Sequence, residues 1–266
     1  MHHWTKLLFA IAAPLLLAGC LWGPGKFSSD LTVRKDGSFV LDYRGEMVLQ
    51  LPPDEAAAQA WTEDKAKCLD GDNERPCSRA EIATQKAQFE KDQRESAARK
   101  HKETEEMAKM FGLPGLDDES NRAFATKLMK FAGWRSVTYR GKGVFDVVYH
   151  FEGRSTQDFL FPALPDNDLI IPFIAIRRRT DGAVLVTAPA FTGGAGPLGA
   201  KAGAAATESM KGGPVSRAQG RFTVITDGEI LTNNSEDGAS AHAIGRQLHW
   251  DVGPASNKIP ETLIRL

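Results

Sequence analysis

The feature that most constrains the fold is a series of short segments in which apolar and polar residues alternate. In residues 38–51, nearly every second position from Phe39 onward is apolar, and polar residues fall between them. A period of two is typical of a strand with one buried face. Asp36-Gly37 precedes this run and is a strong hairpin signal, so a hairpin is predicted here, with a bend at Gly45.

The same pattern returns in the C-terminal half of the chain. Residues 134–153 indicate a hairpin about Gly141-Lys142-Gly143, and further hairpins are predicted to turn at Asp181-Gly182 and at Asp227-Gly228. A last alternating strand covers residues 246–252. Because hairpins in series place neighbouring strands antiparallel, these segments predict an antiparallel sheet.

A helical segment, at about 54–132, is inserted after the first hairpin. One helix is predicted from Asp54 to about Lys65, and a long one from Ser78, which forms a capping box with Glu81, to about residue 111. A third helix is predicted over 118–131, with three apolar side chains on one face: Phe124, Leu128 and Phe131. The predicted fold class is therefore α+β.

The middle of the long helix, residues 90–106, has mixed charges and almost no apolar stripe. A helix of this kind is most often a solvated surface helix. Binding of an envelope protein partner through this charged helix stays open as an alternative.

The first 19 residues have the layout of a secretory signal peptide. Lys6 lies near the start, an apolar run from Leu7 to Leu17 follows, and small residues end the segment. The run is too short to span a bilayer, and a buried N-terminal helix is the weaker alternative.

The end of this segment, Leu17-Ala18-Gly19-Cys20, resembles the lipobox of bacterial lipoproteins. The resemblance implies that Cys20 carries a diacylglyceryl group, that cleavage leaves a single mature domain of residues 20–266, and that the new amino group is acylated. Two or three acyl chains anchor a protein stably, so the expected partner is the membrane, bound through Cys20. The expected location is the cell envelope, facing the periplasm. Leu21 stands where aspartate resembles an inner-membrane retention signal, so the outer membrane is favoured in a Gram-negative cell.

The charge balance argues against nucleic acid as a partner. The chain has 33 lysines and arginines and 34 aspartates and glutamates. A nearly neutral chain gives no electrostatic reason to bind a polyanion.

Cys68 and Cys77 remain once Cys20 is lipidated. The polar segment between them contains Gly71 and Pro76 and is expected to turn back on itself. In an exported protein this pair predicts a disulfide. A metal site is the weaker interpretation, because no histidine lies near and zinc sites use tighter cysteine spacing.

No motif predicts catalysis, and neither a cofactor nor a metal is expected. Gly194, Gly196 and Gly199 match a dinucleotide-binding fingerprint, but that fingerprint needs a parallel βαβ unit and the surroundings here are hairpins. The glycine- and alanine-rich segment 192–214 is instead typical of a flexible loop. The histidines, acids and serines form no recognisable catalytic set, so a non-enzymatic protein is predicted.

The order of several segments resembles the LppM-type family of bacterial lipoproteins. The resemblance rests on LTVRKDGSFVLDY after the lipidated cysteine, on Gly133-Trp134, on FTVITDGEILTNN and on LHWDV, and it covers roughly 31–51 and 134–252. Asp227 stands where the family often has proline, and the charged helix with its cysteine loop is an insertion. The resemblance implies a curved antiparallel sheet related to lipid-binding folds, and binding of a lipid or another amphiphilic ligand.

Four residues on the apolar faces of the strands are the candidate ligand-facing side chains: Phe145, Val147, Tyr149 and Trp250. A curved sheet covered by a single helix can leave an apolar cavity of the kind that ligands occupy. The alternative is that these side chains fill the interior, because protein cores pack densely. A lined cavity favours a ligand-binding lipoprotein, and a filled core favours a scaffold or interaction protein.

Overall fold

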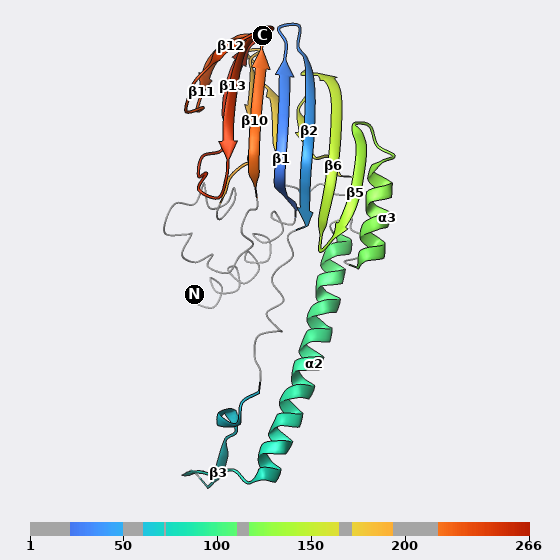
Figure 1. Ribbon diagram of the computed structural model, residues 1–266, viewed down its shortest axis with the longest axis vertical. Coiled ribbons are helices and arrows are strands. Elements are labelled where there is room, and N and C mark those ends of the chain that lie inside the picture. The colour runs from blue at the N-terminus through green and yellow to red at the C-terminus, as the bar shows by residue number, and fades with distance from the viewer. Residues whose placement is uncertain (1–21, 50–60, 72, 111–116, 165–171, 194–217) are drawn as a thin grey trace, which may run out of the picture. The chain divides into compact units, whose positions relative to one another are not determined.

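The structure is a computed structural model, and it describes residues 22–49, 61–71, 73–110, 117–164, 172–193 and 218–266. Cys20, the signal segment and most of the loop 192–214 lie outside these residues. The described residues fall into two compact units, one within 1–52 and 111–266 and the other within 53–110. We call them the sandwich unit and the helical unit (Figure 1).

The sandwich unit contains two sheets and one helix. The seven-stranded sheet has the order β12-β13-β10-β1-β2-β6-β5, and the five-stranded sheet has the order β11-β14-β9-β8-β7. The bounds of these elements are β1 Trp22–Val33, β2 Ser38–Leu49, α3 Asp118–Leu128, β5 Trp134–Gly141, β6 Val144–Arg154, β7 Phe159–Phe161, β8 Ile174–Arg178, β9 Val184–Thr187, β10 Gln219–Thr226, β11 Glu229–Asn233, β12 Ser240–His242, β13 Gly245–Val252 and β14 Glu261–Arg265.

The first predicted hairpin is confirmed as β1 and β2. Gly37 takes a φ of 81°, a left-handed conformation that glycine adopts without strain, and Asp36 accepts hydrogen bonds from the backbone and hydroxyl of Ser38. The irregularity expected near Gly45 is present, because the β1 register shifts between Pro24 and Phe27, opposite this glycine. A Cβ at position 45 would strike the Lys26 carbonyl oxygen, so the close approach of the two strands requires glycine.

The seven-stranded sheet is mixed, whereas the hairpins predicted an antiparallel sheet. β1 pairs with β10 in parallel, from Lys26 opposite Gln219 to Val33 opposite Thr226. The pairs β1–β2, β2–β6, β5–β6, β10–β13 and β12–β13 are antiparallel. Hairpin signals fix the direction of strands that follow each other in sequence, but β1 and β10 are far apart along the chain, so nothing local sets their direction.

The hairpin predicted at Asp227-Gly228 is wrong, although both of its strands exist. β10 belongs to the seven-stranded sheet and β11 to the five-stranded one, so the chain changes sheets at this dipeptide. Asp227 accepts a hydrogen bond of 2.7 Å from the Lys35 backbone, and a Cβ at Gly228 would lie 2.7 Å from the Ile264 side chain. Asp-Gly here makes a tight corner between packed sheets instead of a turn within one sheet.

Aromatic rings fill the space between the two sheets. Tyr43 of β2 contacts Phe161 of β7 and Phe173, with ring centroids 5.0 and 5.9 Å apart, and Phe191 contacts both Phe27 and Phe222. Such contacts run from the β6 side of the sheet to β13, and the rings involved are mostly fully buried. The apolar face is therefore covered by a second sheet as well as by a helix.

The helix α3 begins as predicted but ends earlier. Asp117 caps it by accepting a 2.9 Å hydrogen bond from the Ser120 backbone, and Phe124 and Leu128 are buried. Phe131 lies beyond the last turn and is 44% exposed, so its predicted place in the core is wrong. The chain must turn into β5 at Gly133, where φ is 90° and a side chain would strike the Tyr149 ring.

The helical unit consists of a hairpin and one long helix. Its elements are the 3-10 turn η2 Glu63–Lys65, β3 Cys68–Asp70, β4 Asn73–Arg75 and α2 Arg79–Met110. The predicted long helix is confirmed as α2. The predicted helix from Asp54 lies mainly outside the described residues, and its last residues form η2.

Candidate functional site

Phe145, Val147 and Tyr149 point into the packed core of the sandwich unit. All three are buried. Phe145 contacts Trp22 and Phe124, at centroid distances of 5.4 and 6.1 Å, and Tyr149 contacts Phe161 at 4.5 Å. Burial raises the pKa of Tyr149 to about 12. Their neighbours are protein side chains from α3 and from the second sheet, which occupy the space that a ligand would need.

Trp250 is separated from these three residues and lies beside a groove. Its ring stacks on Phe222 at 5.6 Å, and its indole N–H donates a 2.9 Å hydrogen bond to the Asn234 side chain. Only 8% of its surface is exposed. Of the four candidate ligand-facing residues, Trp250 is the one that borders a described pocket.

The groove beside Trp250 has a volume of about 490 Å³, within the range typical of small-molecule sites. It is formed by β13, by the loop that follows β11 and by the loop between β13 and β14, together with Phe191. Its lining mixes apolar and polar groups: Phe191, Asn234, Glu236, Asp237, His249, Trp250, Asp251, Val252, Gly253, Pro254, Ala255, Ser256, Asn257, Lys258 and Pro260.

Asn234 holds the walls of this groove together. Its side-chain oxygen accepts from the Trp250 indole and, at 2.9 Å, from the Glu261 backbone, and its amide donates a 2.7 Å hydrogen bond to the Ile259 carbonyl. Ser235 donates to the backbone of His249 at 2.9 Å. These bonds fix the loops against β13, so the groove is preorganised.

The acids around the groove are mostly paired. Asp251 receives two hydrogen bonds from Arg221, at 2.8 and 3.1 Å, and this guanidinium lowers the pKa of the Asp251 carboxyl. Asp237 lies 3.0 Å from His249. Arg221 compensates the charge of Asp251, and Asp237 contacts a ring nitrogen of His249, so these carboxylates form a polar rim of the groove.

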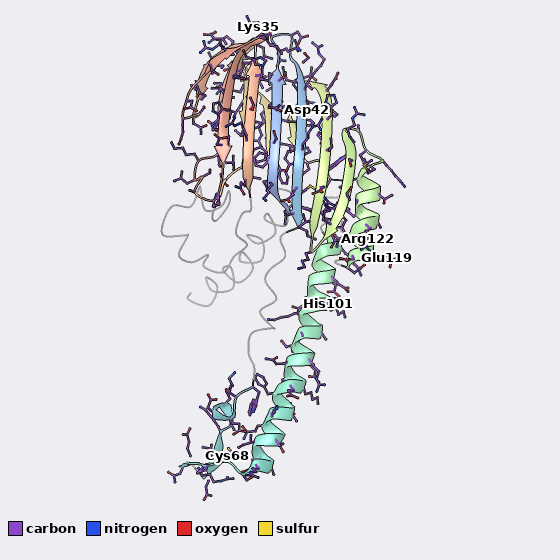
Figure 2. All side chains as sticks on the ribbon, in the orientation of Figure 1. Lys35, Asp42, Cys68, His101, Glu119 and Arg122 are labelled. Atoms are coloured by element: carbon purple, nitrogen blue, oxygen red, sulfur yellow. A yellow bond between two sulfur atoms is a disulfide. The ribbon has the colours of Figure 1, made fainter. Side chains whose placement is uncertain are left out.

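The open face of the seven-stranded sheet carries a second polar cluster. His150 on β6 contacts Asp42 through Nδ1 at 2.8 Å and Glu152 through Nε2 at 3.3 Å, and Asp30 pairs with Asp42 across β1 and β2. Figure 2 labels Asp42 on β2. The hydrogen bond with Asp42 is the main cause that raises the pKa of His150. Across the residues that the structure describes, no group of histidine, cysteine, aspartate and glutamate is placed to hold a metal ion.

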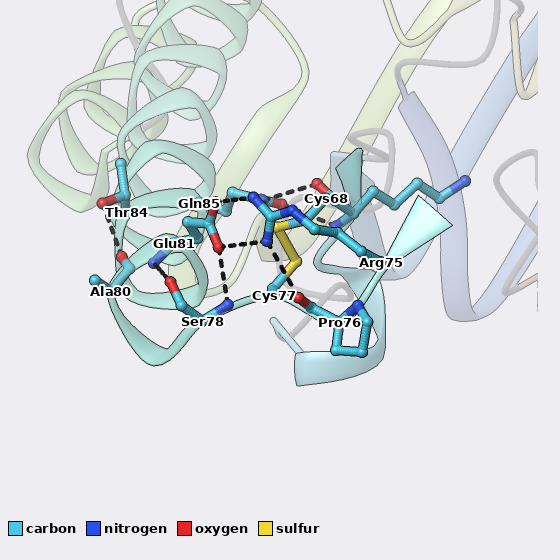
Figure 3. Close-up of polar contacts among 10 residues, drawn as sticks. Cys68, Arg75, Pro76, Cys77, Ser78, Ala80, Glu81, Thr84 and Gln85 are labelled. Atoms are coloured by element: carbon cyan, nitrogen blue, oxygen red, sulfur yellow. Dashed lines mark hydrogen bonds and ion pairs between the residues drawn. A yellow bond between two sulfur atoms is a disulfide. The ribbon is translucent and has the colours of Figure 1, made fainter. Parts of the chain in front are cut away.

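The disulfide predicted between Cys68 and Cys77 is confirmed and closes the hairpin of the helical unit (Figure 3). The S–S distance is 2.12 Å and the Cα atoms are 5.3 Å apart. The predicted capping box is also confirmed, since the Glu81 carboxylate accepts a 2.8 Å hydrogen bond from the Ser78 backbone. Cys77 of the disulfide therefore directly precedes Ser78, the capping residue of α2.

Two further residues clamp the hairpin onto α2. Arg75 donates two hydrogen bonds to Glu81, at 3.0 and 2.6 Å, and this pairing lowers the pKa of Glu81 to about 2. Gln85 accepts from the Lys67 backbone N–H at 3.1 Å and donates to the Lys67 carbonyl at 2.9 Å. The sequence indicated the cysteines and the capping box, but no local signal marked Arg75 or Gln85 as their partners.

The β3 strand of this hairpin exposes a large apolar side chain. Leu69, opposite Glu74 of β4, is 59% exposed, whereas Trp61 of the same unit packs on Phe89 of α2 at 5.3 Å. Beyond the clamp, α2 carries exposed i,i+4 ion pairs, among them Lys91 with Glu95 and Lys102 with Glu106. None of the α2 side chains that the structure describes is buried, so the helix presents a polar surface along its length.

Within the described parts of the chain, no helix is long and apolar enough to cross a bilayer. No protein-family model matches the chain, and no curated protein matches it significantly.

Proposed function

We propose that this protein is a lipid-anchored, non-enzymatic lipoprotein of the cell envelope that acts by binding another envelope protein through its helical unit. The anchor is Cys20, and the mature chain faces the periplasm, on the outer membrane in a Gram-negative cell. The LppM-type resemblance stays a prediction, and the ligand that it implies belongs to the second proposal below.

The filled core is the observation that carries this proposal. Side chains of α3 and of the five-stranded sheet cover Phe145, Val147 and Tyr149, so these residues are not accessible to a ligand. In the helical unit, by contrast, an apolar side chain is held on the surface. The hairpin of this unit is clamped by a disulfide and by Arg75, and its first strand presents an exposed leucine, Leu69. A rigid apolar residue surrounded by polar groups is typical of a protein contact site.

Photo-crosslinking in intact cells tests this proposal. A photoreactive residue in α2, at Lys91 or at Lys102, is expected to give one adduct of constant mass. Leu69→Asp should abolish that adduct, because a carboxylate cannot be buried in an apolar contact without a large penalty. Ile244→Asp is the matched control, since Ile244 is an exposed apolar residue of the sandwich unit and should leave the adduct unchanged.

Circular dichroism and retention of the disulfide must show that both variants are folded. Unchanged adduct formation by a folded Leu69→Asp variant, or the absence of any discrete adduct along α2, would contradict the proposal.

A second function, binding of an amphiphilic small molecule, is favoured by the groove beside Trp250. Its volume of about 490 Å³ and its apolar wall of Trp250, Phe191 and Val252 suit part of a lipid or a similar ligand. Titration of delipidated protein with envelope phospholipids, followed by tryptophan fluorescence, should then saturate. Ala255→Trp should fill the groove and block binding, and Lys35→Glu, at a distant turn, should not.

A further inference from the structure

The sandwich unit becomes rigid almost immediately after the anchoring cysteine. β1 starts at Trp22, whose backbone pairs with Leu49 of β2. The Trp22 ring is buried between Phe124 of α3, at 5.6 Å, and Phe145 of β6, at 5.4 Å. Because the ring is packed on two elements and the backbone is paired, the first strand is held in the fold from its first residue.

The covalent chain between the anchor and this fixed residue is very short. Leu21 is the only residue between Cys20 and Trp22. Two peptide units span at most about 7 Å. A lipidated Cys20 therefore keeps the start of β1 next to the lipid headgroups, whatever conformation the connecting residue adopts.

The strand register identifies which other residues share this end of the sheet. Val48 of β2 lies opposite both Gly23 and Val144, and the Leu49 backbone donates a 2.7 Å hydrogen bond to the Gly143 carbonyl. The β5–β6 turn is thus beside the start of β1. Its central residue, Lys142, is exposed and has a φ of 53°.

The β1–β2 turn lies at the opposite end of the same two strands, where Figure 2 labels Lys35. β2 contains 12 residues. At about 3.3 Å per residue, the two ends of the sheet are roughly 36 Å apart. Lys35 and Lys142 are therefore exposed lysines in turns at the two ends of one rigid sheet.

We infer that the sandwich unit stands on the lipid surface, with Trp22 and the Lys142 turn next to the headgroups and the Lys35 turn directed away from the membrane. This inference rests on the proposed lipid anchor at Cys20. The Lys142 side chain is long enough to reach lipid phosphates while its stem stays near the turn.

The surface of the sheet gives no reason for the unit to lie flat. The exposed large apolar residues found among the described residues are Leu69, Met129, Phe131, Leu160 and Ile244. None of them belongs to β1, β2, β6, β10 or β13, so these strands offer no exposed large apolar side chain to lipid; Val40, Val148 and Ile225 of the open face are half-buried. Asp30 and Asp42 lie in its middle and would be repelled by an anionic leaflet.

Charge alone does not select the Lys142 end. Arg140 is paired with Asp146 at 2.6 Å, and Asp118 of α3 accepts a 2.8 Å hydrogen bond from Tyr139 close by. Positive and negative groups are therefore mixed at this end. The short connection to Cys20 is what orients the unit, and the orientation should depend on its length.

Site-specific fluorescence quenching tests the inference with the full lipidated protein in phospholipid vesicles. Lys142→Cys and Lys35→Cys each add one free thiol, because Cys68 and Cys77 form a disulfide and Cys20 is lipidated. A dye on each thiol is exposed to vesicles that carry a nitroxide on the lipid headgroup. Since the two turns are about 36 Å apart, we expect at least about threefold stronger quenching at position 142 than at position 35.

A spacer variant supplies the control. Twelve glycine and serine residues inserted between Leu21 and Trp22 span about 20 Å, which should release the unit and bring the two quenching values together. The mass of the N-terminal peptide is recorded in every sample. A peptide without acyl chains would overturn the anchor and the orientation with it. Equal quenching at the two positions in lipidated protein without the spacer would overturn the orientation alone.

Discussion

Removal of the disulfide in the helical unit should loosen that unit and leave the sandwich unit intact. Cys68 and Cys77 are 9 residues apart in the sequence. For a loop of about 10 residues, the chain-entropy treatment gives a loss of about 2.7 kcal/mol at 25 °C in a Cys68→Ser/Cys77→Ser variant. The bonds that Arg75 and Gln85 make to the hairpin and α2 remain in that variant, so the hairpin is expected to stay docked most of the time.

Native-state hydrogen exchange is the appropriate assay, because it reports the two units separately. A loss of about 2.7 kcal/mol corresponds to about 100-fold faster exchange of amides whose opening requires undocking of the hairpin, such as those of Lys67 and Ile82. The amides of β1, β2 and β6 should exchange at their original rates. Faster exchange throughout the sandwich unit would refute the division into two units, and unchanged exchange at Lys67 would refute the role of the disulfide as a clamp.

Three other outcomes follow from the contacts described above. Tyr149→Ala should destabilise the sandwich unit by about 3–5 kcal/mol in urea unfolding, whereas Leu160→Ala, at an exposed position, should change stability by less than about 0.5 kcal/mol; equal effects would contradict the packed core. Gly45→Ala should lower the urea midpoint, since its Cβ would strike the Lys26 carbonyl, and an unchanged midpoint would show that the strands can separate without loss. Because the pKa of His150 is raised in the folded state, the pairing of protonated His150 with Asp42 stabilises the fold below the unfolded histidine pKa of about 6.5. This contribution is lost as the pH rises through the folded pKa of His150. The His150→Gln variant should therefore lack this part of the pH dependence of the urea midpoint, and a variant profile identical to that of the wild type would refute the role of the pair.

The parts of the fold that the sequence predicted are those determined by local chemistry. Asp36-Gly37 and Gly141-Lys142-Gly143 turn where the chain needs left-handed backbone, and the glycines at 37, 141 and 143 have φ values of 81°, 94° and 73°. The capping box at Ser78 likewise depends on residues within one helical turn. Signals of this kind act over a few residues, so they fix a turn or a cap, but they do not decide which sheet the following strand joins.

The errors concern contacts between residues that are distant in sequence. The parallel pairing of β1 with β10 and the change of sheets at Asp227-Gly228 both depend on how β10 packs. Phe131 continued the apolar pattern of α3, but the chain had to leave the helix to place Gly133 against Tyr149. Apolar periodicity marks a buried face without saying what covers it, and for this reason it did not distinguish a second sheet from a ligand.

The candidate sites also divide into those that local sequence signals identified and those that form only when distant segments meet. The cysteines were identified from their number and from the predicted export, and Trp250 from the alternation of its strand. The groove beside Trp250 is built by residues such as Asn234 and Ser256, whose loops meet only after folding. No pattern along the chain connects those loops, because their polar residues are also common in ordinary surface turns.

The mass of the N-terminal peptide of the mature protein, isolated from its own membrane, tests the membrane anchor most directly. We predict that this peptide begins at Cys20 and carries a diacylglyceryl group and an amide-linked acyl chain. A peptide that begins at Met1, or one that begins at or beyond Cys20 without lipid, would contradict the membrane anchor on which the proposed function depends.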